Sequence, residues 1–112
     1  MAQQMLADFY GCNSSILDNM ENIRSIAYQM CDEIHAEIIK ECYHKFEPVG
    51  ITYMAVISTS HFSVHTWPEY QYAAVDIFSC DETIPREIAE KMARFFEAEE
   101  TKLQILNRRI GA

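Results

Sequence analysis

Basic residues are scarce in this chain of 112 residues, which carries 9 lysines and arginines against 17 aspartates and glutamates and a formal net charge of -8. A nucleic-acid-binding surface needs a basic face, and the chain has a single adjacent basic pair, Arg108-Arg109. We therefore expect no nucleic-acid partner. An acidic surface also disfavours anionic membranes, whereas it tolerates a cationic ligand.

Long apolar runs are absent as well. No stretch approaches the ~18–20 apolar residues that a transmembrane helix needs, and the N-terminal sequence MAQQMLADFYGC lacks the basic and apolar regions of a signal peptide. We expect no membrane partner and a cytoplasmic location. No CxxC pair occurs, which argues against a zinc ribbon, and reduced thiols are expected at all four cysteines: Cys12, Cys31, Cys42 and Cys80.

The apolar content is that of a globular protein, since hydrophobic residues make up 49% of the chain. The length predicts one domain over residues 1–112. A domain of this size leaves much of its surface exposed, so oligomerisation is a reasonable expectation.

Apolar periodicity predicts the element order β-α-β-β-β-β-α-β. Helical spacing predicts a helix over residues 15–32 and a second helix that Thr83 caps, with Pro85 in its first turn. The buried stripe of that second helix is predicted to be Ile84, Ile88, Met92 and Phe95. Strands are predicted over residues 6–10, 37–46, 51–58, 61–66, 72–79 and 101–107.

Residues 51–58 alternate most clearly, with Ile51, Tyr53, Ala55 and Ile57 on one face. The order of elements indicates an α+β fold. We expect a two-layer sandwich in which two helices pack on one face of a mostly antiparallel sheet.

Reactive side chains gather in the segment ISTSHFSVHTWPEYQYAAVDIFSC, from Ile57 to Cys80. They allow three interpretations. In the first, each residue is structural. In the second, His61 and His65 bind a metal with Cys80, Glu69 or Asp76. The two histidines would lie ~13 Å apart along a strand, so we expect no metal.

The third interpretation is nucleophilic self-processing. A hydroxyl nucleophile needs a nearby base and a carbonyl to attack. Ser60 has the carbonyl of Thr59 directly before it, and histidines follow closely in the sequence. The pattern alone does not choose between these interpretations.

The segment Ser60-His61-x-x-x-His65-Thr66-Trp67-Pro68-Glu69, followed by Asp76 and Cys80, resembles the signature of the prokaryotic S-adenosylmethionine decarboxylase proenzymes. This is the pyruvoyl-dependent family of polyamine synthesis. The resemblance covers nearly the whole chain. Its other parts are Asp8-Phe9-Tyr10-x-Cys12, Leu17-Asp18-Asn19 and His44-Lys45-Phe46 before the Pro48-x-Gly50 turn.

The resemblance implies a proenzyme that cleaves itself into residues 1–59, the β chain, and residues 60–112, the α chain. The Ser60 hydroxyl would attack the Thr59 carbonyl, and elimination and hydrolysis would turn Ser60 into a covalent pyruvoyl group. His65 matches the residue that removes the α-proton during elimination. Thr52 falls where the family commonly carries a serine that assists the rearrangement.

For catalysis, the resemblance implies that S-adenosylmethionine forms a Schiff base with this pyruvoyl group and loses carbon dioxide, giving the aminopropyl donor for spermidine. Cys80 matches the catalytic proton donor. Glu69 matches a carboxylate that binds ribose hydroxyls, and Phe46 and Trp67 match aromatic residues that flank the adenine. The family also implies a homodimer with active sites near the interface.

Three positions depart from the family pattern. Thr59 replaces a common glutamate, and its β-branch crowds the carbonyl under attack. Asp81 replaces a common glycine after Cys80, and the junction Asp32-Glu33-Ile34-His35 lacks the usual small turn residue. Two alternatives therefore stay open: a pyruvoyl-dependent arginine or ornithine decarboxylase, and an unprocessed binding or regulatory relative.

Overall fold

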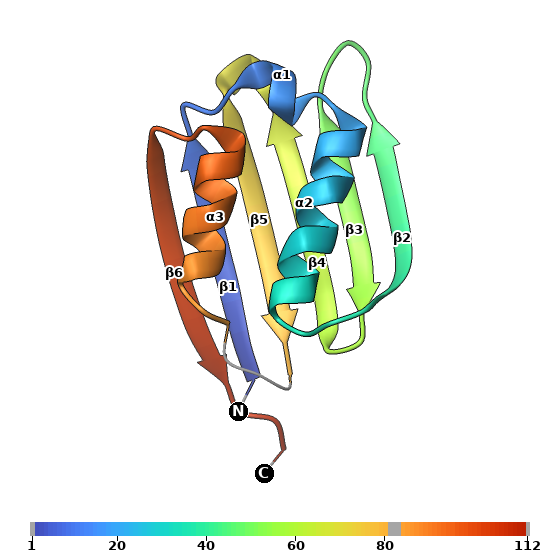
Figure 1. The fold of residues 1–112 in the computed structure, drawn as a ribbon, viewed down its shortest axis with the longest axis vertical. Coiled ribbons are helices and arrows are strands. Elements are labelled where there is room, and N and C mark those ends of the chain that lie inside the picture. Colours follow the sequence, from blue (N-terminus) through green and yellow to red (C-terminus); the bar gives the residue numbers. More distant parts are fainter. Residues whose placement is uncertain (1, 81–83, 112) are drawn as a thin grey trace.

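The fold is a six-stranded antiparallel sheet with helices on one face (Figure 1). The computed structural model describes residues 2–80 and 84–111. The strand order is β2-β3-β4-β5-β1-β6. The strands are β1 (Ala2–Tyr10), β2 (Ile38–Lys45), β3 (Ile51–Ile57), β4 (Ser60–Trp67), β5 (Tyr72–Ser79) and β6 (Glu100–Arg108).

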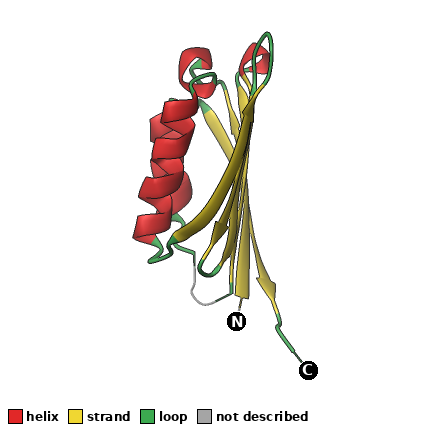
Figure 2. Ribbon diagram, turned by 90° about the vertical axis from the view of Figure 1, so that its right-hand side faces the viewer, coloured by secondary structure: helices red, strands yellow, loops and turns green. Residues whose placement is uncertain are grey.

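The helices are α1 (Ser14–Leu17), α2 (Met20–Glu33) and α3 (Glu87–Phe96), with a 3-10 turn η1 (Pro68–Tyr70). Figure 2 shows that α2 and α3 form one layer and the sheet the other, which leaves the far face of the sheet open. The predicted α+β sandwich is therefore confirmed. None of the helices in the described residues is long and apolar enough to cross a membrane.

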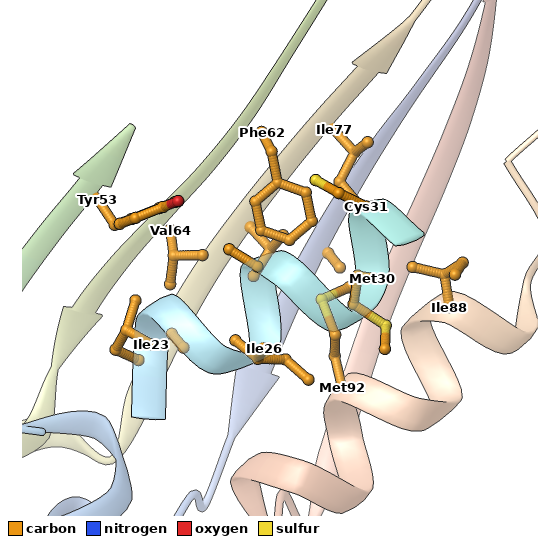
Figure 3. Close-up of a cluster of buried hydrophobic side chains, with 14 of the residues drawn as sticks. Ile23, Ile26, Met30, Cys31, Tyr53, Phe62, Val64, Ile77, Ile88 and Met92 are labelled. Carbon is orange, nitrogen blue, oxygen red and sulfur yellow. The ribbon is translucent and has the colours of Figure 1, made fainter. Parts of the chain in front are cut away.

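The core lies between the helices and the sheet. Alternate residues of β3 are buried, as predicted, because a strand turns every second side chain to the same face. Phe62 and Val64 of β4 meet Ile23 and Ile26 of α2 in this layer (Figure 3). Burying a side chain of this size stabilises the fold by roughly 1.5–3 kcal/mol relative to leaving it exposed. Turning a strand over would expose its apolar side chains, so packing against the helices determines which face of each strand points inward.

The single helix predicted over residues 15–32 is wrong in one respect, because the chain breaks between α1 and α2. Asn19 is extended, with φ -116° and ψ 112°, and its side chain accepts a hydrogen bond from the Asn22 N–H. Asparagine is a favoured N-cap, so it ends one helical turn and starts the next helix.

In the predicted stripe of the last helix, Ile84, Ile88 and Met92 are buried as predicted, and only the last member is wrong. Phe96 is fully buried, whereas Phe95 is only partly buried. The helix begins at Glu87. The predicted cap Thr83 and the departure at Asp81 lie outside the described residues.

His35 adopts the left-handed backbone conformation after α2 that a small turn residue would usually adopt. Its φ is 59°, in the left-handed region, and the Ala36 N–H donates to the Cys31 carbonyl at 2.8 Å. Helices commonly end this way with glycine, which has no Cβ penalty there. The turn therefore forms without a glycine, at the conformational energy cost that a Cβ atom brings in the left-handed region.

Candidate active site

The turn between β3 and β4 carries the predicted cleavage site. Ser58 and Thr59 connect the register partners Ile57 and Ser60. The Ser58 N–H donates to the Glu37 carbonyl at 2.8 Å, and the Ser58 hydroxyl accepts from the Glu37 N–H at 2.9 Å. These two bonds anchor the turn to the segment before β2.

Ser60 has a φ of 147°, a conformation that only glycine adopts at low cost. A non-glycine residue held in such a region stores roughly 1–3 kcal/mol. The anchored turn and the pairing of Ser60 with Ser79 on β5 hold it there. The peptide bond before Ser60 therefore lies at a strained position.

The carbonyl of Thr59 is held from the neighbouring strand. The backbone N–H of Cys80 donates to the Thr59 oxygen at 2.8 Å. A donor placed on a carbonyl oxygen stabilises the negative charge that develops when a nucleophile adds to the carbon. Thr59 and Ser79 are buried, and among the described residues neither of their hydroxyl oxygens has a hydrogen-bond partner.

A second group of predicted residues meets at the opposite end of the sheet. Thr52 Oγ1 lies 3.2 Å from His65 Nδ1 across the β3–β4 register. A hollow of about 410 Å³ adjoins this pair. It lies between the β2–β3 connection and η1, and the predicted site residues that line it are Phe46, Thr52, His65, Trp67 and Glu69.

The two groups do not meet within one protomer. Ser60 and His65 are five residues apart on β4, which separates them by roughly 16 Å at ~3.3 Å per residue. Figure 1 shows the β3–β4 turn at the lower end of the sheet and the β2–β3 connection at the upper end. The structure thus divides the predicted site into two half-sites: the cleavage half-site of Thr59, Ser60 and Cys80, and the binding half-site around His65.

Two residues considered as metal ligands, His61 and Asp76, contact each other instead of sharing a metal site with His65. His61 Nε2 lies 3.5 Å from Asp76 Oδ1, which also accepts from Gln4 Nε2 at 3.0 Å. In residues 2–80 and 84–111, no three histidine, cysteine, aspartate or glutamate side chains are close enough together to hold a metal ion.

Tyr72 is a site neighbour that the sequence analysis overlooked. Its ring stacks on Trp67 with centroids 5.3 Å apart, and its hydroxyl donates to Asp8 Oδ1 at 2.5 Å. The strand alternation could have indicated it, because Trp67 and Tyr72 flank the η1 turn and become register partners in a hairpin.

The open face of the sheet connects the two half-sites. It is hollowed in two places, of about 530 and 560 Å³, and both hollows are lined by Ser63, His65 and Asp76. Met54 and Val56 are 45% and 54% exposed on this face. Exposed apolar side chains grouped on one face are typical of an interaction surface.

Comparison with known proteins agrees with this architecture. The family model described as S-adenosylmethionine decarboxylase matches residues 3–109. An S-adenosylmethionine decarboxylase proenzyme of Thermoanaerobacter sp. (strain X514) is 43% identical over 100 residues, covering 88% of this chain and 81% of the relative. A proenzyme of that name from Caldanaerobacter subterraneus has the same identity and coverage.

A solved structure extends the comparison to the fold. The adenosylmethionine decarboxylase from Aquifex aeolicus VF5 superposes with a TM-score of 0.88 at 27% identity, over all of this chain and 93% of that one. The family match spans nearly the full length and includes both half-sites. The chain therefore belongs to the S-adenosylmethionine decarboxylase family.

Proposed function

We propose that the chain is a proenzyme that cleaves itself between Thr59 and Ser60 and then decarboxylates S-adenosylmethionine. The observation that carries this proposal is the contact of 2.8 Å between the Cys80 N–H and the Thr59 carbonyl, beside a Ser60 held at φ 147°. The carbonyl to be attacked is polarised and the nucleophile adjoins it. These features fit the formation of a pyruvoyl group from Ser60.

Self-processing begins when Ser60 Oγ adds to the Thr59 carbonyl carbon. The C–N bond breaks, the hydroxyl proton passes to the nitrogen, and an ester replaces the peptide bond. Removal of the Ser60 α-proton by His65 then breaks the Cβ–Oγ bond, so that residues 1–59 leave with a terminal carboxylate. Water replaces the amino group, which departs as ammonia, and residue 60 becomes the pyruvoyl group.

His65 reaches Ser60 only from a second copy of the chain. A two-fold axis that lies between two facing open faces, perpendicular to the strands, places the Ser60 end of one β4 opposite the His65 end of its partner. This arrangement completes two equal sites. Ser63 and Ala74 are small residues on the open face, which suits the ~10 Å spacing of packed sheets. We therefore propose a homodimer.

When formed, the pyruvoyl carbonyl supplies an electron sink for the bond to the departing carboxyl group. Cys80 is exposed beside the cleavage site, where its thiol can return a proton to the substrate α-carbon. In the binding half-site, Glu69 can accept hydrogen bonds from ribose hydroxyls. Phe46 and Trp67 offer aromatic faces for adenine and for the sulfonium charge.

The hollow of the binding half-site favours S-adenosylmethionine over the two amino-acid substrates. Arginine and ornithine have no ring system to occupy the space beside Phe46 and Trp67, whereas S-adenosylmethionine has one. The product would be an aminopropyl donor for spermidine synthesis. The chain's four cysteines are free thiols, which suits the cytoplasm as its location.

The test measures carbon dioxide release from carboxyl-labelled S-adenosylmethionine, arginine and ornithine in separate reactions, with Ser60→Ala as the inactive control. We expect release from S-adenosylmethionine alone. Preferential release from arginine or ornithine would instead establish the amino-acid decarboxylase. Release from none of the three by an uncleaved chain would support the binding or regulatory relative.

A further inference from the structure

Aromatic rings form a continuous stack that crosses three strands at the binding half-site. Trp67 of β4 stacks on Tyr72 of β5, with centroids 5.3 Å apart and an interplanar angle of 28°. Tyr72 in turn stacks on Tyr10 of β1, at 5.2 Å and 24°. Lys102 Nζ of β6 lies 5.6 Å from the Tyr10 ring centroid. One side of Trp67 is thus backed by a column of stacked rings.

A single hydrogen bond fixes the middle ring of this column. The Tyr72 hydroxyl donates to Asp8 Oδ1 at 2.5 Å, and a bond to a charged acceptor is among the stronger ones in proteins. Burial and the bond to Asp8 raise the pKa of Tyr72 above its ordinary value, so the phenol remains a donor near neutral pH. Among the described residues, Asp8 makes no other side-chain hydrogen bond or ion pair.

Trp67 needs such support because it lies at the end of a strand and remains 39% exposed. An exposed side chain ordinarily exchanges between rotamers. Ordering it only when a ligand arrives would reduce the affinity, since binding then has to offset the lost rotamer freedom. Trp67 lines the hollow that also contains Phe46.

We propose that Tyr72, anchored by Asp8, is a positioning residue that holds the Trp67 indole in place as a preformed wall of a slot for a planar purine ring. Phe46 provides a second aromatic side chain in the same hollow. The identity of the ligand rests on the proposed function, whereas the immobilisation of Trp67 does not.

Trp67 is the only tryptophan of the chain, so its fluorescence reports directly on this wall. In Tyr72→Phe the ring remains and the anchor is lost. We expect acrylamide to quench Trp67 more strongly and its fluorescence anisotropy to decay faster than in the wild type. The KM for S-adenosylmethionine is expected to rise roughly three- to tenfold, as for the loss of part of one charge-assisted hydrogen bond.

The same variant should leave kcat and self-processing close to wild type, because the Tyr72 hydroxyl donates to Asp8, which takes part in no step of the proposed chemistry. A rise in KM without a change in kcat is the signature of lost uniform binding. A general structural defect would lower processing as well. Tyr70→Phe is the matched control, because Tyr70 is highly exposed on η1 and its hydroxyl donates to no described residue.

A double-mutant cycle isolates the anchoring bond. Asp8→Ala should reproduce the effects of Tyr72→Phe, and the double variant should be no worse than either single variant, since all three lack one bond. Asp8→Asn keeps an oxygen acceptor and should restore most of the Trp67 rigidity.

Unchanged Trp67 quenching, anisotropy and KM in Tyr72→Phe would overturn the proposal. So would effects on KM that multiply in the double variant. If the wild type releases no carbon dioxide from S-adenosylmethionine, the proposed function fails. The fluorescence comparison, which needs no substrate, still decides the role of Tyr72.

Discussion

The backbone N–H of Cys80 donates to the carbonyl oxygen of Thr59 at 2.8 Å, so the residue predicted to act through its thiol also contacts the predicted cleavage site through its amide. The amide is fixed by the pairing of β4 with β5. The thiol is exposed and free. In the proposed mechanism the two groups serve different steps, and a side-chain substitution separates them.

Cys80→Ala should still self-cleave, because the substitution keeps the backbone donor on Thr59. Decarboxylation should fall by roughly 10²- to 10⁴-fold, the range for a lost general acid. Gel electrophoresis measures cleavage and labelled carbon dioxide measures turnover. Cys42→Ala is the control, since Cys42 is an exposed cysteine on the edge strand β2, away from the cleavage half-site. Undiminished decarboxylation by Cys80→Ala would remove its thiol from the mechanism.

His65→Ala should stop at the ester stage, because the α-proton of Ser60 is then left without its base. Hydroxylamine cleaves esters, so it should split the trapped chain at Thr59. His61→Ala is the matched control on the same face of β4, and it should process normally. Normal processing of His65→Ala without hydroxylamine would be incompatible with the assigned role.

A mixed dimer tests whether the two half-sites come from different chains. Ser60→Ala and His65→Ala, carrying different tags, are co-expressed and purified through both tags. One site of this dimer combines the intact Ser60 of one chain with the intact His65 of the other. We expect cleavage of the His65→Ala chain alone. No cleavage in the mixed dimer, as in each separate homodimer, would place the site within one protomer.

The part-buried ion pair between Arg24 of α2 and Glu41 of β2 predicts a pH dependence of stability. Arg24 Nε and a terminal guanidinium nitrogen donate to the Glu41 carboxylate at 3.2 and 2.9 Å, and the Tyr53 hydroxyl donates to it at 2.7 Å. The hydrogen bond from Arg24 lowers the pKa of Glu41 below its usual value. The unfolded chain therefore takes up this proton first as the pH falls.

The contribution of the ionised Glu41 to the free energy of unfolding is complete above the ordinary carboxyl pKa of about 4.3. It is lost as the pH falls through the lowered pKa that Glu41 has in the folded protein. Glu41→Gln should lower the free energy of unfolding at pH 7 by about 1–3 kcal/mol. That difference should shrink at pH 3.5. Urea unfolding at both pH values measures it, with the exposed Glu37→Gln as control. An equal difference at both pH values would contradict the assignment.

The strands facing the helices were the predictable part of the fold. Burial alternates cleanly in β3 because one face packs on the helices. The edge strand β2 shows no such alternation, since most of its side chains are exposed on both faces, and its pattern suited a helix almost equally well. The break at Asn19 and the shift from Phe95 to Phe96 depended on local capping and on the rotation of one helix against the sheet.

The resemblance predicts which residues form the site, but it does not predict how far apart they lie. Ser60 and His65 are close in sequence, and only the extended course of β4 puts them at opposite ends of the sheet. The approach of Thr52 to His65 likewise follows from the β3–β4 register. The role of Tyr72 could not be predicted from the sequence, because Tyr72 contacts Asp8 and Tyr10 across the pairing of β5 with β1. These two residues lie 64 and 62 positions before it in the sequence.

Denaturing intact-mass analysis of the purified protein, beside Ser60→Ala, tests the central claim most directly. Self-processing predicts two chains, residues 1–59 ending in the Thr59 carboxylate and residues 60–112 beginning with a pyruvoyl group, and an uncut Ser60→Ala control. A single uncut wild-type chain after prolonged incubation, with the same mass behaviour as Ser60→Ala, would contradict it.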